Sequence, residues 1–504
     1  MAKIFIIGGG VSGLSAGIYA QLNGYRAVIC EKHFAAGGNL TGWDRGAYHI
    51  DNCIHWLTGT NPASRTYRMW RELGALGDGV EVFQGETLYT VEHAGQRLSL
   101  FADLRKTERD MLEISPRDSR EIRSLVRGVE WVQRICGIAG AEHDEGMTLT
   151  GIVQLVPVLG KYYGLTTGEL AARFSHPLLR KFIAAFWGDD FGSLALLMVF
   201  AHFCGQNGGI PRGSSCCMAE RMTERFRSLG GEVLLGKEAV KVNLCGGKAE
   251  SVTLGDGSVI PADYVVLTGD PAVMFGGVLD APMPAWLRRQ YENPKLMRFS
   301  SCQCAFACAM EEPPFHGDFI FDIPEGETHC IPLKQVIVRE FSHEKSFAPA
   351  GESVLQTMTF CYEKDAEALI ALRREDRAAY EAAKRELADC LAAHLVAQFP
   401  QMAGKLRCID VWTPATYKRF TGSEIGSYMS FTMPSRMLPG RASGAIPGLS
   451  NVFLATQWQQ IPGGLPIAAE SGKQAVLTIM RREKRLGSRV GKKAYPDAAH
   501  GTTI

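Results

Sequence analysis

The chain begins with an alternation of short apolar runs and small residues. A β-branched run at residues 4–7 leads directly into glycines, small and apolar residues continue to about Asn23, and a second apolar run at residues 27–30 ends in Glu31. Short apolar runs are typical of buried parallel strands, and the segment between them has the length of a helix. Residues 4–31 therefore predict a strand, a glycine loop, a helix and a second strand.

Helical patterns dominate the next part of the chain. The Ser115–Asp118 segment is typical of a helix start, with proline at the first helical position, and this helix is predicted to run to about Cys136. Residues 150–210 are predicted to be helical and unusually apolar, with His176–Pro177 starting one helix. The pattern leaves open whether these helices pack in a core or line a lipid or substrate surface.

Strand patterns return in the second half. Apolar runs around residues 231–242 and 262–267 enclose an Asp256–Gly257 turn, and longer β-rich runs follow at Ser301–Ala309, Gln335–Glu340 and Val354–Tyr362. One alanine-rich helix is predicted from about Lys364 to Gln398, with the charges at 373–376 on its solvated face. A last strand at 451–455 precedes a glycine loop and a helix that runs through Met480.

Composition narrows the class of protein. The 504 residues exceed the roughly 250–300 at which single cores stop growing, so more than one domain is expected. Hydrophobic residues make up 46% and charged residues 21%, as in folded soluble chains. The net charge of +1 gives no reason to expect a nucleic-acid partner.

The cysteines and the apolar stretches bear on location. The 14 cysteines lack zinc-site spacing, so we expect reduced thiols and no metal, and the alternation of Cys302, Cys304 and Cys308 favours core packing. No secretory signal is recognised, and the apolar stretch Leu194–Cys204 is shorter than the about 20 residues that span a bilayer. We expect a cytoplasmic protein and leave peripheral membrane association open.

The first glycine loop carries the chemistry of a dinucleotide site. Gly8 allows the tight turn, Gly10 allows a close approach of backbone to a pyrophosphate, and Gly13 allows the helix to pack on the strand. The phosphates would lie at the helix N-terminus, where free N–H groups favour anions. Glu31, at the end of the second strand, would accept hydrogen bonds from ribose hydroxyls.

The next glycine pair favours FAD over NAD, and a later one has a role to play in a flavin enzyme. Gly37–Gly38 would bring a second loop against the pyrophosphate, and the loop at 462–466 would place a helix N-terminus near the N1–C2=O edge of a reduced flavin. No second GxGxxG occurs, so a resident NAD(P)H domain is not expected. The electron donor or acceptor would then be a transient partner.

These motifs together resemble the phytoene desaturase and carotenoid isomerase family, which includes the retinol saturases. The matching segments, which extend over nearly the whole chain, are residues 8–31, 37–38, 115–118, 413–416, 419–422 and 462–472. The resemblance implies an FAD-binding fold of the glutathione-reductase type, non-covalent FAD and a long apolar substrate. It does not specify which substrate.

The resemblance also implies a set of cofactor contacts. The ADP half would be held by Gly8, Gly10, Gly13, Glu31, Gly38 and Val240, and the isoalloxazine would lie along Gly463, Gly464, Leu465 and Pro466. Further contacts are expected from Ser12, Leu14, Lys32, Gly37, Asn39 and Gly269. Family members usually carry Gly-Asp after the last strand, where this chain has Ala455-Thr456-Gln457, so Gln457, Thr456 or water would replace that contact.

We therefore predict an α/β fold in which a Rossmann-like FAD domain carries an inserted substrate domain of mixed β-sheet and helices. The FAD domain is assigned to residues 1–105, 211–290 and 441–482, the helical substrate or membrane-facing region to 106–210, the substrate domain to 291–440 and a basic flexible tail to 483–504. The tail carries a cluster of lysines and arginines that could bind an anionic membrane or simply be solvated.

The leading functional hypothesis is hydride transfer to or from a carbon–carbon bond of an apolar lipid, such as an isoprenoid, retinoid-like, steroid or fatty-acyl molecule. The Ile54-His55-Trp56 segment resembles the Ile-His-Tyr of retinol saturases, so His55 is the candidate catalytic residue, with a structural histidine as the alternative. A flavin-dependent isomerase without net redox change is a second hypothesis. A third is a lipid-binding protein without flavin, like the Rab escort proteins, against which the intact glycines and Glu31 argue.

Overall fold

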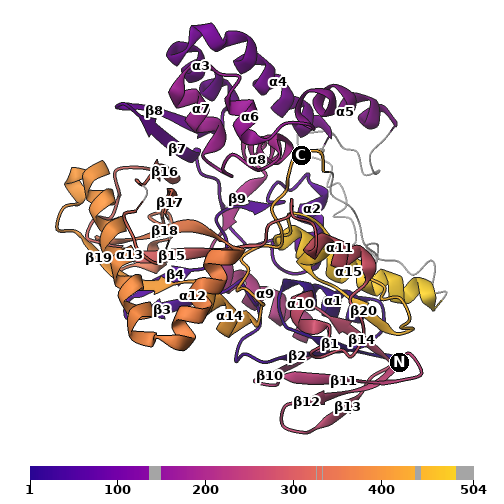
Figure 1. The fold of residues 1–504 in the computed structure, drawn as a ribbon. Coiled ribbons are helices and arrows are strands. Elements are labelled where there is room, and N and C mark those ends of the chain that lie inside the picture. Colours follow the sequence, from indigo (N-terminus) through magenta and orange to yellow (C-terminus); the bar gives the residue numbers. More distant parts are fainter. Residues whose placement is uncertain (136–148, 325, 332, 438–443, 484–504) are drawn as a thin grey trace, which may run out of the picture.

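The computed structural model describes residues 1–135, 149–324, 326–331, 333–437 and 444–483 (Figure 1). Its nucleotide-binding part is a five-stranded parallel sheet with the strand order β10-β2-β1-β14-β20. The strands are β1 (Lys3–Ile7), β2 (Arg26–Glu31), β10 (Glu232–Leu235), β14 (Tyr264–Leu267) and β20 (Val452–Leu454). Three distant stretches of the chain thus build one sheet, in which the edge strand β10 is partly exposed and the other four strands are mostly buried.

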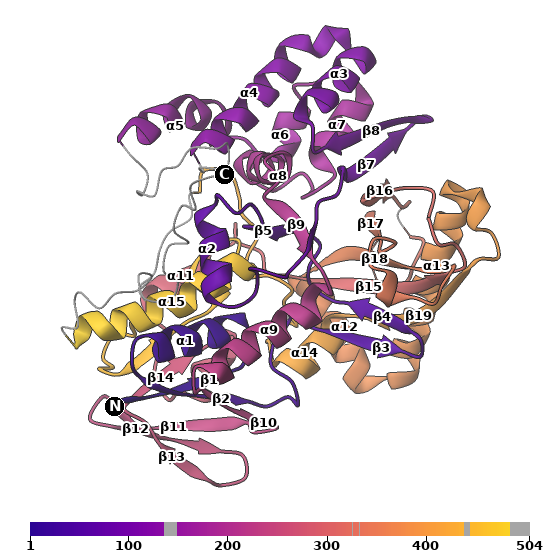
Figure 2. The ribbon, with the colours of Figure 1, turned by 180° about the vertical axis from the view of Figure 1, so that it is seen from behind.

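Helix α1 (Val11–Leu22) lies between two other helices, α9 (Ser214–Ser228) and α15 (Leu465–Arg482) (Figure 2). Both contacts depend on glycine. A Cβ at Gly17 would lie 2.7 Å from Phe226 of α9, and one at Gly472 would lie 2.4 Å from the Ser12 carbonyl oxygen. Residues 11–20 are all buried, which explains why α1 is apolar on every side rather than amphipathic.

The substrate part is a seven-stranded mixed sheet with the order β19-β15-β18-β17-β16-β7-β8. Its strands are β7 (Thr87–His93), β8 (Gln96–Phe101), β15 (Phe299–Cys308), β16 (Asp318–Asp322), β17 (Gln335–Glu340), β18 (Ser353–Tyr362) and β19 (Leu406–Trp412). The hairpin β7–β8 falls within residues 1–105, which we had assigned to the FAD domain. That boundary is wrong, because β7 pairs in parallel with β16 and extends the substrate sheet.

Two helices cover the outer face of this sheet, where one was predicted. Helix α12 (Glu363–Glu375) and helix α13 (Arg377–Gln398) are separated by the single residue Asp376. The Asp376 carboxylate accepts the backbone N–H of Ala379 at 2.9 Å, so this residue caps α13, and it is exposed to solvent as predicted. Apolar residues of α13 pack on the sheet in a core that includes Cys302, Cys304 and Cys308.

A helical layer covers β7 and β8 on the other side of the molecule (Figure 2). It consists of α3 (Leu104–Ile114), α4 (Ser119–Ile135), α5 (Leu149–Tyr162), α6 (Thr167–Ala171), α7 (Pro177–Ala184) and α8 (Ser193–Cys204). The predicted start at Ser115 is a 3-10 turn, η1 (Pro116–Asp118), that leads into α4. His176 caps α7 as expected, and the apolar residues of α7 are buried in this layer.

The remaining elements connect these parts. They are β3 (Gly42–Arg45), β4 (Tyr48–Asp51), β5 (Leu57–Thr58), α2 (Arg65–Glu72), β6 (Val82–Phe83), β9 (Gly208–Pro211), β11 (Ala239–Cys245), β12 (Lys248–Leu254), β13 (Val259–Pro261), α10 (Pro271–Met274), α11 (Ala285–Tyr291), η2 (Lys345–Phe347), η3 (Pro400–Met402), α14 (Pro414–Thr421) and η4 (Gln457–Gln459). Among the described residues, no helix combines the length and apolarity needed to cross a membrane. The basic tail predicted at 483–504 lies, after Glu483, outside the described residues.

Candidate active site

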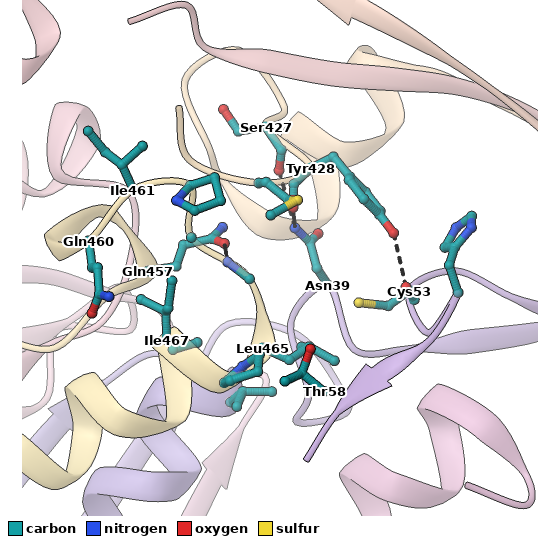
Figure 3. A pocket seen from close by; sticks show the side chains of 18 of the residues that line it. Asn39, Cys53, Thr58, Ser427, Tyr428, Gln457, Gln460, Ile461, Leu465 and Ile467 are labelled. Atoms are coloured by element: carbon teal, nitrogen blue, oxygen red, sulfur yellow. Dashed lines mark hydrogen bonds between the residues drawn. The ribbon is translucent and has the colours of Figure 1, made fainter. Parts of the chain in front are cut away.

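A cavity of about 660 Å³ begins at the first glycine loop and continues between the helical layer and the substrate sheet. Its volume is in the range of small-molecule and cofactor sites. Side chains from all parts of the chain meet around it, including Asn39, Tyr428, Gln457 and Leu465 (Figure 3). The predicted catalytic histidine, His55, also lines this cavity.

The nucleotide end is a cradle made by two glycine loops. Gly8, Gly10, Ser12, Gly37 and Gly38 all line it, and the Gly37 N–H donates to the Gly9 carbonyl at 2.9 Å. Gly37 and Gly38 have φ angles of +132° and +64°, which favour glycine. A Cβ at Gly10 would have no atom nearer than 3.9 Å, so open space lies between the two loops. This space at the N-terminus of α1 suits a pyrophosphate.

Glu31 closes the cradle at the end of β2. Its carboxylate is buried, lines the cavity and accepts the backbone N–H groups of Gly9 at 2.7 Å and His33 at 2.9 Å. Each carboxylate oxygen can accept a further bond, so both remain able to accept ribose hydroxyls. The two backbone donors fix the carboxylate in place before any ligand binds.

Four residues expected to contact the cofactor lie outside the cavity wall. A Cβ at Gly13 would lie 2.0 Å from the Gly8 carbonyl oxygen, so Gly13 is needed for packing, as its motif predicts. Leu14 is a core residue whose N–H already donates to the Gly10 carbonyl at 2.9 Å, which leaves that amide unavailable to a phosphate. Lys32 is exposed and lies against Gly422, and Val240 is 43% exposed.

The middle of the cavity offers polar atoms that have no partner among the described residues. The Asn39 amide nitrogen donates to the carbonyls of Ser427 and Tyr428 at 3.2 and 3.4 Å, while Asn39 Oδ1 and Ser427 Oγ are buried and unbonded (Figure 3). Buried polar atoms in proteins almost always have partners. A cofactor with hydroxyl and amide groups would supply them here. Gly269 lines the cavity nearby.

The C-terminal loop forms the opposite wall. The residues that line the cavity here are Gln457 of η4 and, at the start of α15, Gly463, Gly464, Leu465 and Pro466. Gln457 Oε1 accepts the Gly464 N–H at 3.0 Å and so holds the loop (Figure 3). Gly463 and Gly464 have φ angles of +87° and +97°, a conformation that disfavours other residues. A helix N-terminus therefore faces the cavity, as the sequence predicts.

His55 lies in the apolar half of the cavity. Its Nδ1 is buried and has no partner in the described part of the chain, and its ring makes an edge contact with Tyr428 at 6.0 Å between centroids. Burial, with a smaller contribution from Arg339, lowers the pKa of His55 well below its ordinary value, so the ring is uncharged at neutral pH. The Tyr428 hydroxyl donates to the Cys53 carbonyl at 2.9 Å (Figure 3).

Sequence reasoning missed a second histidine in the wall. His202 is the polar residue near the end of the apolar helix α8, and a nitrogen of its ring lies 2.9 Å from the Asn207 amide nitrogen. Burial lowers the pKa of His202 to about 4. A lone histidine in an apolar helix is a signal that could have been noticed. The rest of this chamber is mostly apolar, with Trp187, Met198 and Phe360 in its walls.

The family of the chain follows from its sequence as a whole. Residues 11–480 match the family described as flavin containing amine oxidoreductase. The chain belongs to this family. As a flavin containing amine oxidoreductase it is an FAD-dependent oxidoreductase, and the glycine cradle, Glu31 and the unbonded polar atoms of the cavity fit FAD.

Several known relatives of this flavin containing amine oxidoreductase carry the names that the motifs suggest. It is 22% identical to a phytoene desaturase (neurosporene-forming) of Rhodobacter capsulatus over 54% of the chain, and the match covers only 53% of that protein. It is 23% identical to the prolycopene isomerase of Arabidopsis thaliana over 84% of the chain and 73% of the relative. The 4,4'-diapophytoene desaturase of a Methylomonas species is 21% identical, and the match covers 95% of this chain and 96% of that protein. The predicted resemblance is confirmed.

Solved structures share the fold. An oxidoreductase from Methanosarcina mazei has a TM-score of 0.60 and 15% identity, covering 95% of this chain and all of that one. Cyclohexylamine oxidase from Brevibacterium oxydans has a TM-score of 0.57 and 14% identity, covering 96% and 100%. The predicted FAD-binding fold is thereby confirmed.

Proposed function

We propose that the protein transfers a hydride between FAD and a carbon–carbon bond of an apolar molecule, which is thereby desaturated or saturated. The observation that carries this proposal is the single cavity that joins the glycine cradle to a chamber with walls of Trp187, Met198 and Phe360. An apolar substrate is proposed because most of the chamber wall is made of apolar side chains. The electron donor or acceptor is proposed to be a transient partner.

Bound FAD would supply the hydride acceptor or donor. The chain supplies position, a dry environment and proton handling. Gly8, Gly10, Gly37 and Gly38 would hold the pyrophosphate, Glu31 the ribose, and the loop from Gly463 to Pro466 the flavin ring. Apolar walls exclude water and hold the reacting bond. His55 is proposed to handle the proton, because its Nδ1 is buried at the cavity with no hydrogen-bond partner among the described residues.

Product analysis tests this proposal. The purified yellow holoprotein is incubated without oxygen with a membrane lipid extract, once with oxidised and once with prereduced flavin, and products are identified by mass spectrometry. We expect a product that differs from its precursor by two hydrogen atoms. A Gly10→Val variant, designed to lack FAD, is the matched control and should give no product.

Two other outcomes would favour the alternatives. A product of unchanged mass that forms only with prereduced flavin would favour a double-bond isomerase, for which the long match to prolycopene isomerase is a supporting observation. Protein that is purified colourless and does not take up added FAD would contradict the proposal. That result would revive the hypothesis of a lipid-binding protein without flavin.

A further inference from the structure

A buried ion pair belongs to the substrate sheet beside the cavity. Arg339 of β17 and Asp318 of β16 are register partners, and they are 5% and 2% exposed. Arg339 Nε donates to Asp318 Oδ1 at 2.7 Å, and Arg339 Nη2 donates to the other carboxylate oxygen. Asp318 lines the cavity, although the chamber around it is mostly apolar. A charged pair is costly to bury, so its presence here calls for a reason.

The register puts Arg339 on the cavity face of the sheet. Residues two apart on a strand share a face, and Ile337, two residues before Arg339, lines the cavity. On the adjacent strand, Met358 is the partner of Ile337 and also lines the cavity. The charge of Arg339 also contributes to lowering the pKa of His55, so the guanidinium lies within electrostatic range of that ring.

Two donor or acceptor atoms are left over at this place. Arg339 Nη1 is buried and has no hydrogen-bond partner among the described residues, and the same holds for His55 Nδ1. A guanidinium nitrogen can only donate, so Nη1 needs an acceptor. Asp318 already binds the other side of the guanidinium. Asp318 is the member of this ion pair that lines the cavity, and we infer that a ligand beside Asp318 supplies the missing acceptor.

We propose that Arg339, held by Asp318 and next to His55, forms a subsite for an uncharged oxygen of the substrate, such as a carbonyl oxygen, which would accept a hydrogen bond from Arg339 Nη1. The substrate would then be an apolar molecule with an oxygen function and not a pure hydrocarbon. An uncharged oxygen is favoured over a carboxylate, because Arg339 and Asp318 neutralise each other and His55 is uncharged. This inference rests on the proposed function and narrows its substrate class.

Binding of three molecules with one skeleton tests the subsite. Farnesal, farnesoate and farnesene share an isoprenoid chain and end in an aldehyde, a carboxylate or no oxygen. Each is titrated into the oxidised holoprotein, and the change in the flavin absorbance spectrum gives the Kd. We expect farnesal to bind at least about tenfold more tightly than farnesene, since one hydrogen bond to a charged donor is gained, and more tightly than farnesoate.

The matched variants remove whole ion pairs. Arg339→Met together with Asp318→Leu leaves no uncompensated buried charge and should abolish the preference for farnesal over farnesene. The control makes the same two changes at Lys181 and Asp322, whose ion pair of 2.7 Å involves the same strand β16 but does not line the cavity. The control should keep the preference of the wild type.

Several results would overturn the subsite. Equal Kd values for farnesal and farnesene in the wild type, no binding of farnesal, or tightest binding of farnesoate would each contradict it. A preference that survives in the folded Arg339 and Asp318 double variant would also contradict it, and if that variant does not fold, the ranking in the wild type decides. Protein without FAD would instead contradict the proposed function, so the two failures are distinguishable.

Discussion

Gly10 and Gly13 lie three residues apart in one loop, yet alanine at each should have different effects. A Cβ at Gly13 would lie 2.0 Å from the Gly8 carbonyl oxygen and 3.1 Å from its carbon, where ordinary contacts are about 3.5–4.0 Å. A Cβ at Gly10 would meet nothing nearer than 3.9 Å, and its backbone, with φ of −69°, is open to any residue. We predict that Gly13→Ala destabilises the fold and that Gly10→Ala weakens FAD binding alone.

Two opposing contributions decide whether Gly13→Ala stabilises or destabilises the fold. Alanine in a helix gains about 1 kcal/mol over glycine, whereas overpacking against a backbone group that cannot move away costs about 3 kcal/mol or more. Gly13→Ala should therefore lower the free energy of unfolding by about 2 kcal/mol. For a domain of about 150–250 residues, such as the FAD domain, this lowers the melting temperature by about 4–8 °C. At Gly10 the new methyl group would occupy the open space between the two glycine loops, so the FAD content should fall about tenfold or more.

Two measurements on each variant check this prediction. Thermal unfolding of the FAD-free protein reports on packing without any contribution from the cofactor, and titration of the same samples with FAD gives the Kd. A Gly13→Ala apoprotein that melts with the wild type would refute the steric argument. A Gly10→Ala protein with unchanged Kd for FAD would show that the pyrophosphate does not bind between the loops.

Four further predictions follow from the same cavity and from the tail. Glu31→Ala should weaken FAD binding by about 1.5–3 kcal/mol for each ribose hydrogen bond lost, and an unchanged Kd would exclude Glu31 as the ribose ligand. His55→Ala should bind FAD normally and turn over about 100-fold more slowly if His55 moves a proton, whereas wild-type turnover would make it structural. Because burial lowers the pKa of His202 to about 4 while the unfolded chain keeps about 6.5, the unfolded state binds the extra proton, and stability should fall by about 2 kcal/mol between neutral pH and pH 5. His202→Gln should flatten that decline in urea titrations, and an unchanged slope would contradict the assignment. The protein should sediment together with anionic liposomes, and added salt or removal of the residues after Arg482 should abolish this binding. Protein that stays in the supernatant would leave membrane attachment without support.

The nucleotide end could be predicted from the sequence because its requirements are local. Positive φ angles at Gly8 and Gly37 and the close contact of Gly13 can be met only by glycine, so the residue type itself indicates the geometry. Leu14 was misjudged for a related reason. The motif gives its position on the helix, but whether an amide near the N-terminus is free depends on the first helical hydrogen bond, here to Gly10.

The substrate half depends on pairings between distant strands, which local patterns do not encode. The apolar alternation of β7 does not say that it pairs with β16, more than 200 residues later, so the hairpin was assigned to the wrong domain. The pair of Arg339 and Asp318 was missed because the apolar patterns predicted a strand at Gln335–Glu340 but none at β16, the strand that carries Asp318. The break at Asp376 is different, because an aspartate followed by a helical pattern is a cap signal that could have been used.

The crossing of α1 and α15 has a consequence for biosynthesis. The two helices are in contact although about 450 residues separate them, and Gly472 fits against the Ser12 carbonyl only when both are present. A chain emerging from the ribosome exposes the loop at Gly8 to Gly13 early, but the wall from Gly463 to Pro466 and the strand beside β14 are made last. Helix α9 can cover one side of α1 by the middle of translation, but the side that packs against α15 stays exposed until translation is nearly finished. Chains that end before residue 465 should be captured by chaperones rather than by FAD.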